Sequence, residues 1–260
     1  MSGETGNEDT MGGLTIIGNH ISPFVRKVLA TCEIKGLPYR IDSFVPFFGD
    51  DRFAKLSPLR RIPVLIDGDV VVNDSSVICE YLEEKWPQAA VLPGDPAARA
   101  RSRFLDEYAD TRMSDVLLWK VFGRATVGPA IFGVPRDLAA IQSTLASEFP
   151  LVMDQLEAWA PGSAFAGGAS PGMADLSVVS HFANLRWARA TVDAARWPRT
   201  SAWIERVEAQ SPLGRLNAIG EKLLRVPPNG HRPVLESMGV AVCEETLGGE
   251  APVRGPMTVV

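Results

Sequence analysis

The chain has 260 residues, 46% of them hydrophobic and 22% charged, and a net charge of -5. This ordinary composition excludes a fibre or a disordered chain, and the length fits one large domain or two smaller ones. The acidic balance argues against a nucleic-acid partner. No apolar run reaches the roughly 18 to 20 residues that span a bilayer, and residues 1–13 lack the features of a secretory signal. We therefore expect no membrane partner and a cytoplasmic location.

Cysteine usage argues against two kinds of site. The cysteines stand far apart, at Cys32, Cys79 and Cys243, with no CxxC motif and no histidine at metal-ligand spacing. We expect neither a disulfide framework nor a metal site. Because Cys32 and Cys79 fall within predicted amphipathic helices, we interpret them as buried structural thiols.

Residues 14–87 predict a β-α-β-α-β-β-α unit. A β-type run at 14–17 precedes a helix that carries apolar residues on one face and ends at Gly36. The alternating run 39–43 predicts a second strand, which a right-handed crossover places parallel to the first.

A hairpin and a helix are predicted to complete this unit. Runs 63–67 and 70–73 flank Gly68-Asp69, a sequence typical of a tight turn between antiparallel strands. Residues 73–76 offer helix-capping side chains, and apolar residues at helical spacing follow them up to Trp86-Pro87.

The remainder of the chain predicts an all-helical half, so the fold class is α/β followed by all-α. Residues 88–95 contain Leu-Pro-Gly-Asp and are interpreted as a linker, and 96–226 as a helical bundle. Residues 123–135 are expected to form a loop, 1–13 a disordered leader, and 227–260 an irregular tail that either covers a pocket or is disordered. The predicted helices cover 96–119, 137–159, 173–190, 197–209 and 213–226.

The first motif that could carry chemistry begins at Ser22-Pro23, where a strand leads into a helix. Taken alone, a serine N-cap followed by proline is an ordinary helix start. Val25 stands where a capping box would place Glu or Gln, so the hydroxyl is free for another partner. A hydroxyl at the positive end of a helix can donate a hydrogen bond to an anion.

The second motif is Arg60-Arg61-Ile62-Pro63 at the start of a strand. A proline here can simply mark the edge of the sheet. If the Ile62-Pro63 bond is cis, the backbone of Ile62 turns outward and can pair with a peptide-like ligand that lies as an extra strand.

The third motif is Asp74-Ser75 at the next helix start, again a pair of ordinary capping residues when taken alone. In a functional interpretation, the Ser75 hydroxyl and backbone N–H hold a carboxylate while Asp74 faces an ammonium group. Together they would clamp the end of an α-amino acid.

These motifs, in this order and followed by a helical half, resemble the soluble glutathione transferase family. The resemblance covers about 14–226 and rests on SPFVRKV at 22–28, SPLRRIPVL at 57–65 and DSSVICEYL at 74–82. It implies a thioredoxin-like N-terminal domain over 14–87, a helical domain over 96–226, a two-fold homodimer, and a role in detoxification. Glutathione would be the co-substrate, without a metal.

The resemblance also assigns roles to individual residues. Ser22 corresponds to the thiol-activating hydroxyl of a serine-type site, and Ile62 to the backbone partner of the cysteinyl unit. Pro63 corresponds to the cis-proline, and Asp74 with Ser75 to the γ-glutamyl clamp. Arg61 is expected near the glycyl carboxylate.

The chain departs from the family pattern at two positions. Arg60 stands where glycine is frequent, so the backbone before the cis-proline is expected to be less permissive. Gly172 replaces a Ser or Thr helix cap, with Asp175 in a structural role three positions later.

Three charged or polar residues near Ser22 receive separate interpretations. His20 is interpreted as a surface loop residue, with a supporting role as base left open, and Asn19 could face the sulfur. Arg26 is interpreted as a solvated or ion-paired surface charge.

The expected reaction is attack of the glutathione thiolate on a small hydrophobic electrophile. A thiol with a pKa of about 8.5 is only about 3% ionised at pH 7. Lowering this pKa by ~2 units takes roughly 2.7 kcal/mol, within reach of a hydroxyl and a helix N-terminus. The alternatives are a glutathione-dependent lyase, isomerase or peroxidase, a non-catalytic binding or scaffold protein, and a storage protein for hydrophobic ligands.

Overall fold

A four-stranded sheet organises the N-terminal half of the protein. The computed structural model describes residues 13–162 and 164–255. The sheet order is β2-β1-β3-β4, with β2 parallel to β1 and β3 antiparallel to both of its neighbours. The predicted parallel pair and hairpin are thus confirmed. The strands are β1 (Leu14–Ile17), β2 (Tyr39–Asp42), β3 (Val64–Asp67) and β4 (Val70–Asn73).

The register of the sheet follows from its buried apolar residues. Ile16 pairs with Ile41 on one side and Leu65 on the other, and all three are fully buried. A shift by one residue would turn such side chains to the opposite face, so burial fixes the pairing. Gly68 adopts the left-handed conformation (φ +59°) at the hairpin turn, where glycine carries no steric cost.

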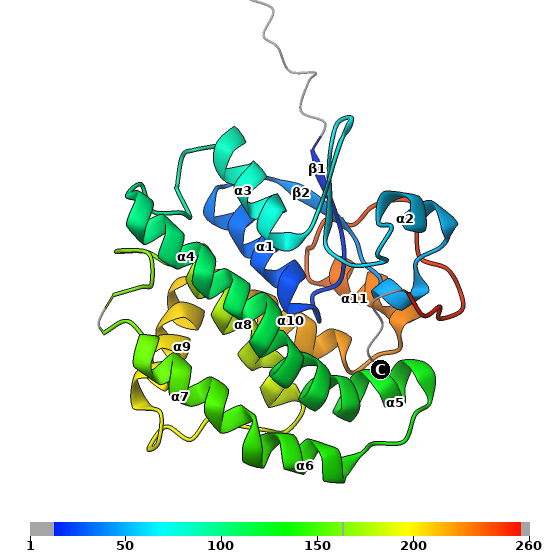
Figure 1. Cartoon of the computed structure of the whole chain (residues 1–260). Coiled ribbons are helices and arrows are strands. Elements are labelled where there is room, and N and C mark those ends of the chain that lie inside the picture. The colour runs from blue at the N-terminus through cyan, green and yellow to red at the C-terminus, as the bar shows by residue number, and fades with distance from the viewer. Residues whose placement is uncertain (1–12, 163, 256–260) are drawn as a thin grey trace, which may run out of the picture.

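Helices of the N-terminal half complete the predicted β-α-β-α-β-β-α order. Figure 1 shows α1 and α3 on the side of the sheet that faces the helical half, with α2 away from it. The helices are α1 (Pro23–Ile34), the short 3-10 helix η1 (Pro46–Phe48), α2 (Asp51–Leu56) and α3 (Ser75–Lys85).

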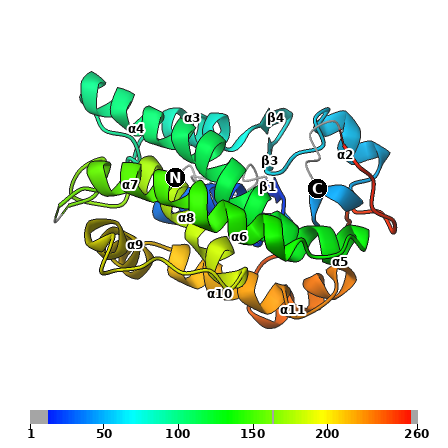
Figure 2. The ribbon, with the colours of Figure 1, turned by 60° about the horizontal axis from the view of Figure 1, so that its bottom comes forward.

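The helical half is built around α8, which is buried along residues 173–185 and packs against α1, α4 and η2. In this half, α4 continues directly into η2, which is wound as a π-helix. Figure 2 shows the helical half in layers, with α4 above α7 and α8, and α9 and α10 below them. No helix in residues 13–162 and 164–255 is long and apolar enough to cross a membrane. The helices are α4 (Pro96–Tyr108), η2 (Ala109–Val127), α5 (Gly128–Phe132), α6 (Leu138–Ser147), α7 (Phe149–Trp159), α8 (Met173–Trp187), α9 (Pro198–Gln210) and α10 (Leu213–Leu223).

Two predictions for this half are wrong in detail. Residues 123–135 are not a loop throughout, because η2 runs to Val127 and α5 follows, ending at Gly133 with φ +64°. The predicted helix over 137–159 is two helices that divide at Glu148. Pro150 explains the division, because proline lacks an N–H and is tolerated only in the first turn of a new helix.

The tail is not irregular throughout, contrary to prediction. It contains η3 (Pro228–Gly230) and α11 (His231–Ser237), and Leu235 is fully buried in the core. The high content of glycine and proline that suggested an irregular segment is outweighed by tertiary packing. Of the predicted leader 1–13, residues 1–12 lie outside the described residues.

The unusual cap of α8 has a steric reason. A Cβ at Gly172 would lie 2.7 Å from the carbonyl oxygen of Val91, so a Ser or Thr cap does not fit. Asp175 accepts hydrogen bonds from the Gly172 N–H at 3.0 Å and from Trp203 Nε1 at 2.6 Å. These contacts fit the predicted structural role of Asp175.

Candidate active site

A cavity of about 480 Å³ lies between the sheet half and the helical half. Its walls come from the loop before α1, the segment before β3, the β4–α3 junction, and η2 with the chain after α10. Three motifs from separate parts of the sequence therefore meet at one place. The residues with predicted binding roles that line the cavity are Ser22, Arg61, Ile62, Pro63, Asp74 and Ser75.

Ser22 is the N-cap of α1. Its Oγ accepts a hydrogen bond from the Val25 N–H at 3.4 Å, and Pro23 occupies the first helical position. The first turn of α1 holds no acidic residue, so no side chain of that turn neutralises the positive end of the helix. The Oγ acts as an acceptor within the cap, which leaves the hydroxyl hydrogen available to an anion in the cavity.

The segment before β3 has the cis Ile62-Pro63 bond of the functional interpretation. Ser57 holds this segment, because its Oγ donates to the Arg61 carbonyl at 2.8 Å and accepts from the Arg61 N–H at 2.9 Å. Arg60 adopts φ +52°, a left-handed conformation that glycine would favour. Arg60 therefore holds this left-handed backbone conformation at a steric cost that glycine would not have.

The junction between β4 and α3 combines a cap with a buried hydroxyl. The Asp74 carboxylate accepts from the Ser76 N–H at 2.9 Å and the Val77 N–H at 3.3 Å. Ser75 is buried, and its Oγ donates to Oδ2 of Asp110 at 3.5 Å. Asp110 belongs to η2, lines the cavity, and was not among the residues selected from sequence.

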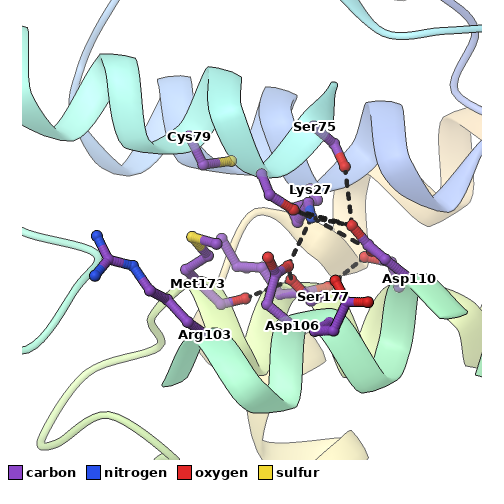
Figure 3. Close-up of polar contacts among 12 residues, drawn as sticks. Lys27, Ser75, Cys79, Arg103, Asp106, Asp110, Met173 and Ser177 are labelled. Carbon is purple, nitrogen blue, oxygen red and sulfur yellow. Dashed lines mark hydrogen bonds and ion pairs between the residues drawn. The ribbon is translucent and has the colours of Figure 1, made fainter. Parts of the chain in front are cut away.

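Behind Asp110 lies a buried lysine, shown in Figure 3. Lys27 Nζ lies 2.7 Å from Asp106, 3.1 Å from Asp110 and 3.1 Å from Ser76 Oγ. Ser177 also donates to Asp106. These contacts join α1, α3, α4, η2 and α8, so a single ammonium group connects the two halves of the protein beside the cavity.

The charges in this cluster shift one another's pKa. Burial alone would lower the pKa of Lys27, but Asp106 and Asp110 outweigh it, and the net shift is upward. Burial raises the pKa of Asp110, and the like charge of Asp106 adds to this against the effect of Lys27. With Lys27 charged and both carboxylates ionised, the cluster carries one excess negative charge. An ammonium ligand would neutralise it.

Comparison with known proteins gives the family. A family model described as "Glutathione S-transferase, N-terminal domain" matches residues 21–85. The probable glutathione S-transferase GSTU6 of Oryza sativa subsp. japonica is 30% identical over 212 residues, which cover 76% of this chain and 85% of the relative. This chain belongs to the glutathione S-transferase family. It is a glutathione transferase.

Solved structures share the fold of this transferase. The apo form of human glutathione-S-transferase T1-1 superposes with a TM-score of 0.71 at 24% identity, covering 88% of this chain and 99% of the human chain. A glutathione S-transferase from Rhodospirillum rubrum F11 gives a TM-score of 0.69 at 22% identity, with 94% and 96% coverage. The predicted thioredoxin-like and helical halves are thereby confirmed.

Arg26 of the transferase is not the surface charge that was predicted. Its side chain is fully buried and donates to the carbonyls of His20 at 2.6 Å and Ile21 at 2.9 Å. It also donates to the Ser180 carbonyl and to Asn184 Oδ1, each at 2.6 Å. Burial lowers the pKa of Arg26 to about 9. The arginine thus fixes the loop before Ser22 to α8, a helix more than 150 residues further along the chain.

The prediction that His20 lies on the surface is also wrong. The residue is fully buried, and it is not among those that line the cavity of the transferase. Burial lowers the pKa of His20 to about 3, so its ring is neutral at physiological pH. Asn19, in contrast, does line the cavity.

The predicted burial of the Cys32 and Cys79 thiols is confirmed. Cys32 and Cys79 are both buried, and burial raises the pKa of both thiols, that of Cys79 to about 12. Burial also raises the pKa of Cys243. Within residues 13–162 and 164–255, no three His, Cys, Asp or Glu side chains form a group that could hold a metal ion.

Much of the cavity wall is apolar and lies away from the three motifs. Trp119 and Phe122 line the transferase cavity, whereas Met113 is fully buried in the core and Asp115 pairs with Lys120 at 2.8 Å. Further apolar lining comes from Phe24, Val45, Phe47, Leu118, Val127, Ile131, Leu223, Leu224 and Val226.

Proposed function

We propose that this transferase uses Ser22 to stabilise the thiolate of glutathione for attack on a small hydrophobic electrophile. The observation that carries the proposal is the Ser22 hydroxyl at an unneutralised helix N-terminus, facing the same cavity as Pro63 and Ser75. A hydroxyl hydrogen bond and a helix dipole both stabilise the charged form of a thiol and therefore lower its pKa.

The proposed reaction transfers no electrons to or from the protein. The thiol releases its proton to solvent, and the thiolate sulfur forms a bond to an electrophilic carbon. Either a leaving group departs with its bonding electron pair, or the carbanion of an addition product takes up a proton. Ser22 remains a hydrogen-bond donor throughout and forms no covalent bond.

Glutathione is proposed to lie across the three motifs. The backbone of Ile62 pairs with the cysteinyl unit, and Ser75 binds the γ-glutamyl carboxylate. Arg61 lies near the glycyl carboxylate, and its exposed side chain can reach a carboxylate at the rim. The carboxylate of Asp74 accepts a hydrogen bond at the start of α3. Asp110, which lies beside Ser75, supplies a second negative charge that faces the γ-glutamyl ammonium.

The acceptor is proposed to lie against the apolar wall formed by η2, α5 and the chain after α10. Trp119, Phe122 and Ile131 lie there, and aromatic and aliphatic side chains favour an uncharged, apolar compound. Thiolate addition to such a compound fits the implied role in detoxification.

The wild-type protein provides the first test of this proposal. Titration with reduced glutathione, followed by the ultraviolet absorbance of the thiolate across pH, should show saturable binding. The apparent pKa of the bound thiol should lie below about 7, against about 8.5 for a free cysteine thiol. Binding with an unshifted thiol pKa would instead support a carrier or scaffold.

Replacement of Asp110 by asparagine is expected to weaken glutathione binding about 10-fold, corresponding to ~1.4 kcal/mol, because the ammonium loses a buried counter-charge. Calorimetry with glutathione and with an analogue that lacks the α-amino group measures this. The analogue should bind wild type and D110N equally. Asp115→Asn on the same helix, which pairs with Lys120 outside the cavity, is the matched control and should change neither affinity. An equal loss for both ligands would contradict the role of Asp110.

A further inference from the structure

The chain after α10 forms part of the active-site wall before it returns to the sheet. Leu224, Val226, Pro228 and His231 all line the cavity. The helix α11 packs against α10, and in both ribbon views the red C-terminal segment runs next to α2. The described part of the tail, residues 227–255, is therefore packed against the N-terminal half.

Backbone hydrogen bonds attach this tail to the edge strand β2. The Ile41 N–H donates to the Ala241 carbonyl at 2.9 Å, and the Cys243 N–H donates to the Ile41 carbonyl at 3.0 Å, in a parallel arrangement. The Leu247 N–H then donates to Asp42 Oδ2 at 2.8 Å. Such pairing covers groups that an edge strand would otherwise expose, and it holds α11 in one place.

Within this tail, the ring of His231 reaches the loop that carries Ser22. His231 is 2% exposed and Asn19 is 0% exposed, and His231 Nδ1 lies 2.9 Å from Asn19 Nδ2. Asn19 Oδ1 accepts from the Ile21 N–H at 3.0 Å, and Asn19 Nδ2 also donates to Ser43 Oγ at 3.2 Å. The side-chain amide is thus held by three different segments.

These contacts determine the hydrogen-bonding role of His231. Since the Ile21 N–H can only donate, the Asn19 atom facing it must be the oxygen, and the atom facing His231 is the NH₂ group. His231 Nδ1 must then be an acceptor, which places the ring proton on Nε2 and leaves the ring neutral. Burial lowers the pKa of His231, in agreement with a neutral ring.

We propose that His231 is a positioning residue for thiol activation, because it holds Asn19, and Asn19 fixes the backbone that presents Ser22. The Ser22 N–H donates to the Asn19 carbonyl at 2.9 Å, immediately before α1 begins. Asn19 thus accepts hydrogen bonds from both Ile21 and Ser22, the two residues that lead into the helix. The inference rests on the proposed role of Ser22 and adds a contribution of the tail to the same site.

A pair of substitutions at His231 separates this role from simple packing. His231→Asn keeps an acceptor near the position of Nδ1, whereas His231→Leu has similar bulk and no acceptor. We expect H231L to raise the thiol pKa of bound glutathione by about 1 unit and to lower kcat about 10-fold at pH 6, below that pKa. Its glutathione Kd should stay within about twofold of wild type, and H231N should restore the wild-type pKa and kcat.

Arg232 provides the matched control. It lies next to His231 on α11, donates to Glu236 at 3.1 Å and to the Glu244 carbonyl at 2.9 Å, and does not line the cavity. Arg232→Gln should leave the thiol pKa unchanged. An unshifted pKa in H231L, an equal defect in H231N, or an equal shift in R232Q would each overturn the proposal.

Two further measurements keep the inference separate from folding and from the role of Ser22. If H231L does not fold, imidazole nitrogen NMR of the wild-type protein decides, because a proton on Nδ1 at pH 7.5 overturns the inference and a proton on Nε2 supports it. Ser22→Ala is measured in parallel. A pKa shift in S22A without one in H231L would remove only the role of His231, whereas no shift in S22A would remove the proposed function of Ser22.

Discussion

Ser22→Ala is expected to raise the thiol pKa of bound glutathione by about 1.5 units and to lower kcat/KM about 20-fold at pH 6. The hydroxyl is the group at the N-terminus of α1 that can donate to the sulfur, and its loss leaves the helix dipole to act alone. Glutathione affinity should change little, since the γ-glutamyl and cysteinyl contacts come from Ile62 and Ser75. Thiolate absorbance and steady-state kinetics across pH measure both effects.

Loss of the serine also removes a helix cap, which costs about 1 kcal/mol of stability. Asp95→Ala is the matched control, because Asp95 caps α4 through the Ala98 N–H at 2.8 Å and does not line the cavity. D95A should lower stability by a similar amount and leave the thiol pKa unchanged. A wild-type pH profile in S22A, or the same pKa shift in D95A, would contradict thiolate stabilisation by Ser22.

The sequence alone predicts the parts of the site whose contacts are local. The side chains of Ser22 and Asp74 each accept a hydrogen bond from a backbone N–H three positions further along the chain. Both helix caps therefore appear within short sequence motifs. The hairpin and the parallel strand pair also follow from periodicity and turn residues over short spans. Each motif has an ordinary structural explanation, and their order along the chain indicates one site.

The remaining parts of the site depend on contacts between distant residues. Lys27 meets Asp106 across 79 positions, Arg26 meets Asn184 across 158, and Asn19 meets His231 across 212. Hydrophobic periodicity places Arg26 and Lys27 on the polar face of an amphipathic helix, which normally faces solvent. Here α8 and α4 cover that face, and the charges are buried because carbonyls and carboxylates meet them there.

The helix boundaries differ from prediction for a related reason. The α11 region is rich in glycine and proline, and a local pattern there predicts no regular structure. Burial of Leu235 in the core and of His231 beside Asn19 stabilises the helix instead. Tertiary contacts of this kind outweigh propensities of a few tenths of a kcal/mol per residue.

Lys27→Met is expected to lower the free energy of unfolding by about 3 to 5 kcal/mol, the largest stability effect expected here. The substitution keeps most of the side-chain volume but leaves the buried carboxylate of Asp106 and the partly buried carboxylate of Asp110 without their cation. Urea unfolding at pH 7.5 measures the loss. Arg103→Met is the matched control, because Arg103 also joins α4 to α3, through Glu80, but its side chain is 47% exposed. An exposed pair of this kind contributes less than about 1 kcal/mol.

The pH dependence of Lys27→Met provides a second, independent criterion. Loss of Lys27 removes the charge that opposes burial at Asp110, so the folded-state pKa of Asp110 rises further above the unfolded value of about 3.9. A group with a raised folded-state pKa binds its proton more tightly in the folded protein, so stability rises as pH falls through that pKa. The difference between wild type and K27M should therefore narrow from pH 7.5 to pH 5.5. A loss below about 1 kcal/mol, or a difference that widens in acid, would show that Lys27 does not balance these carboxylates. In the double variant K27M/D106N, one of the two charges is gone, and part of the lost stability should return at pH 7.5.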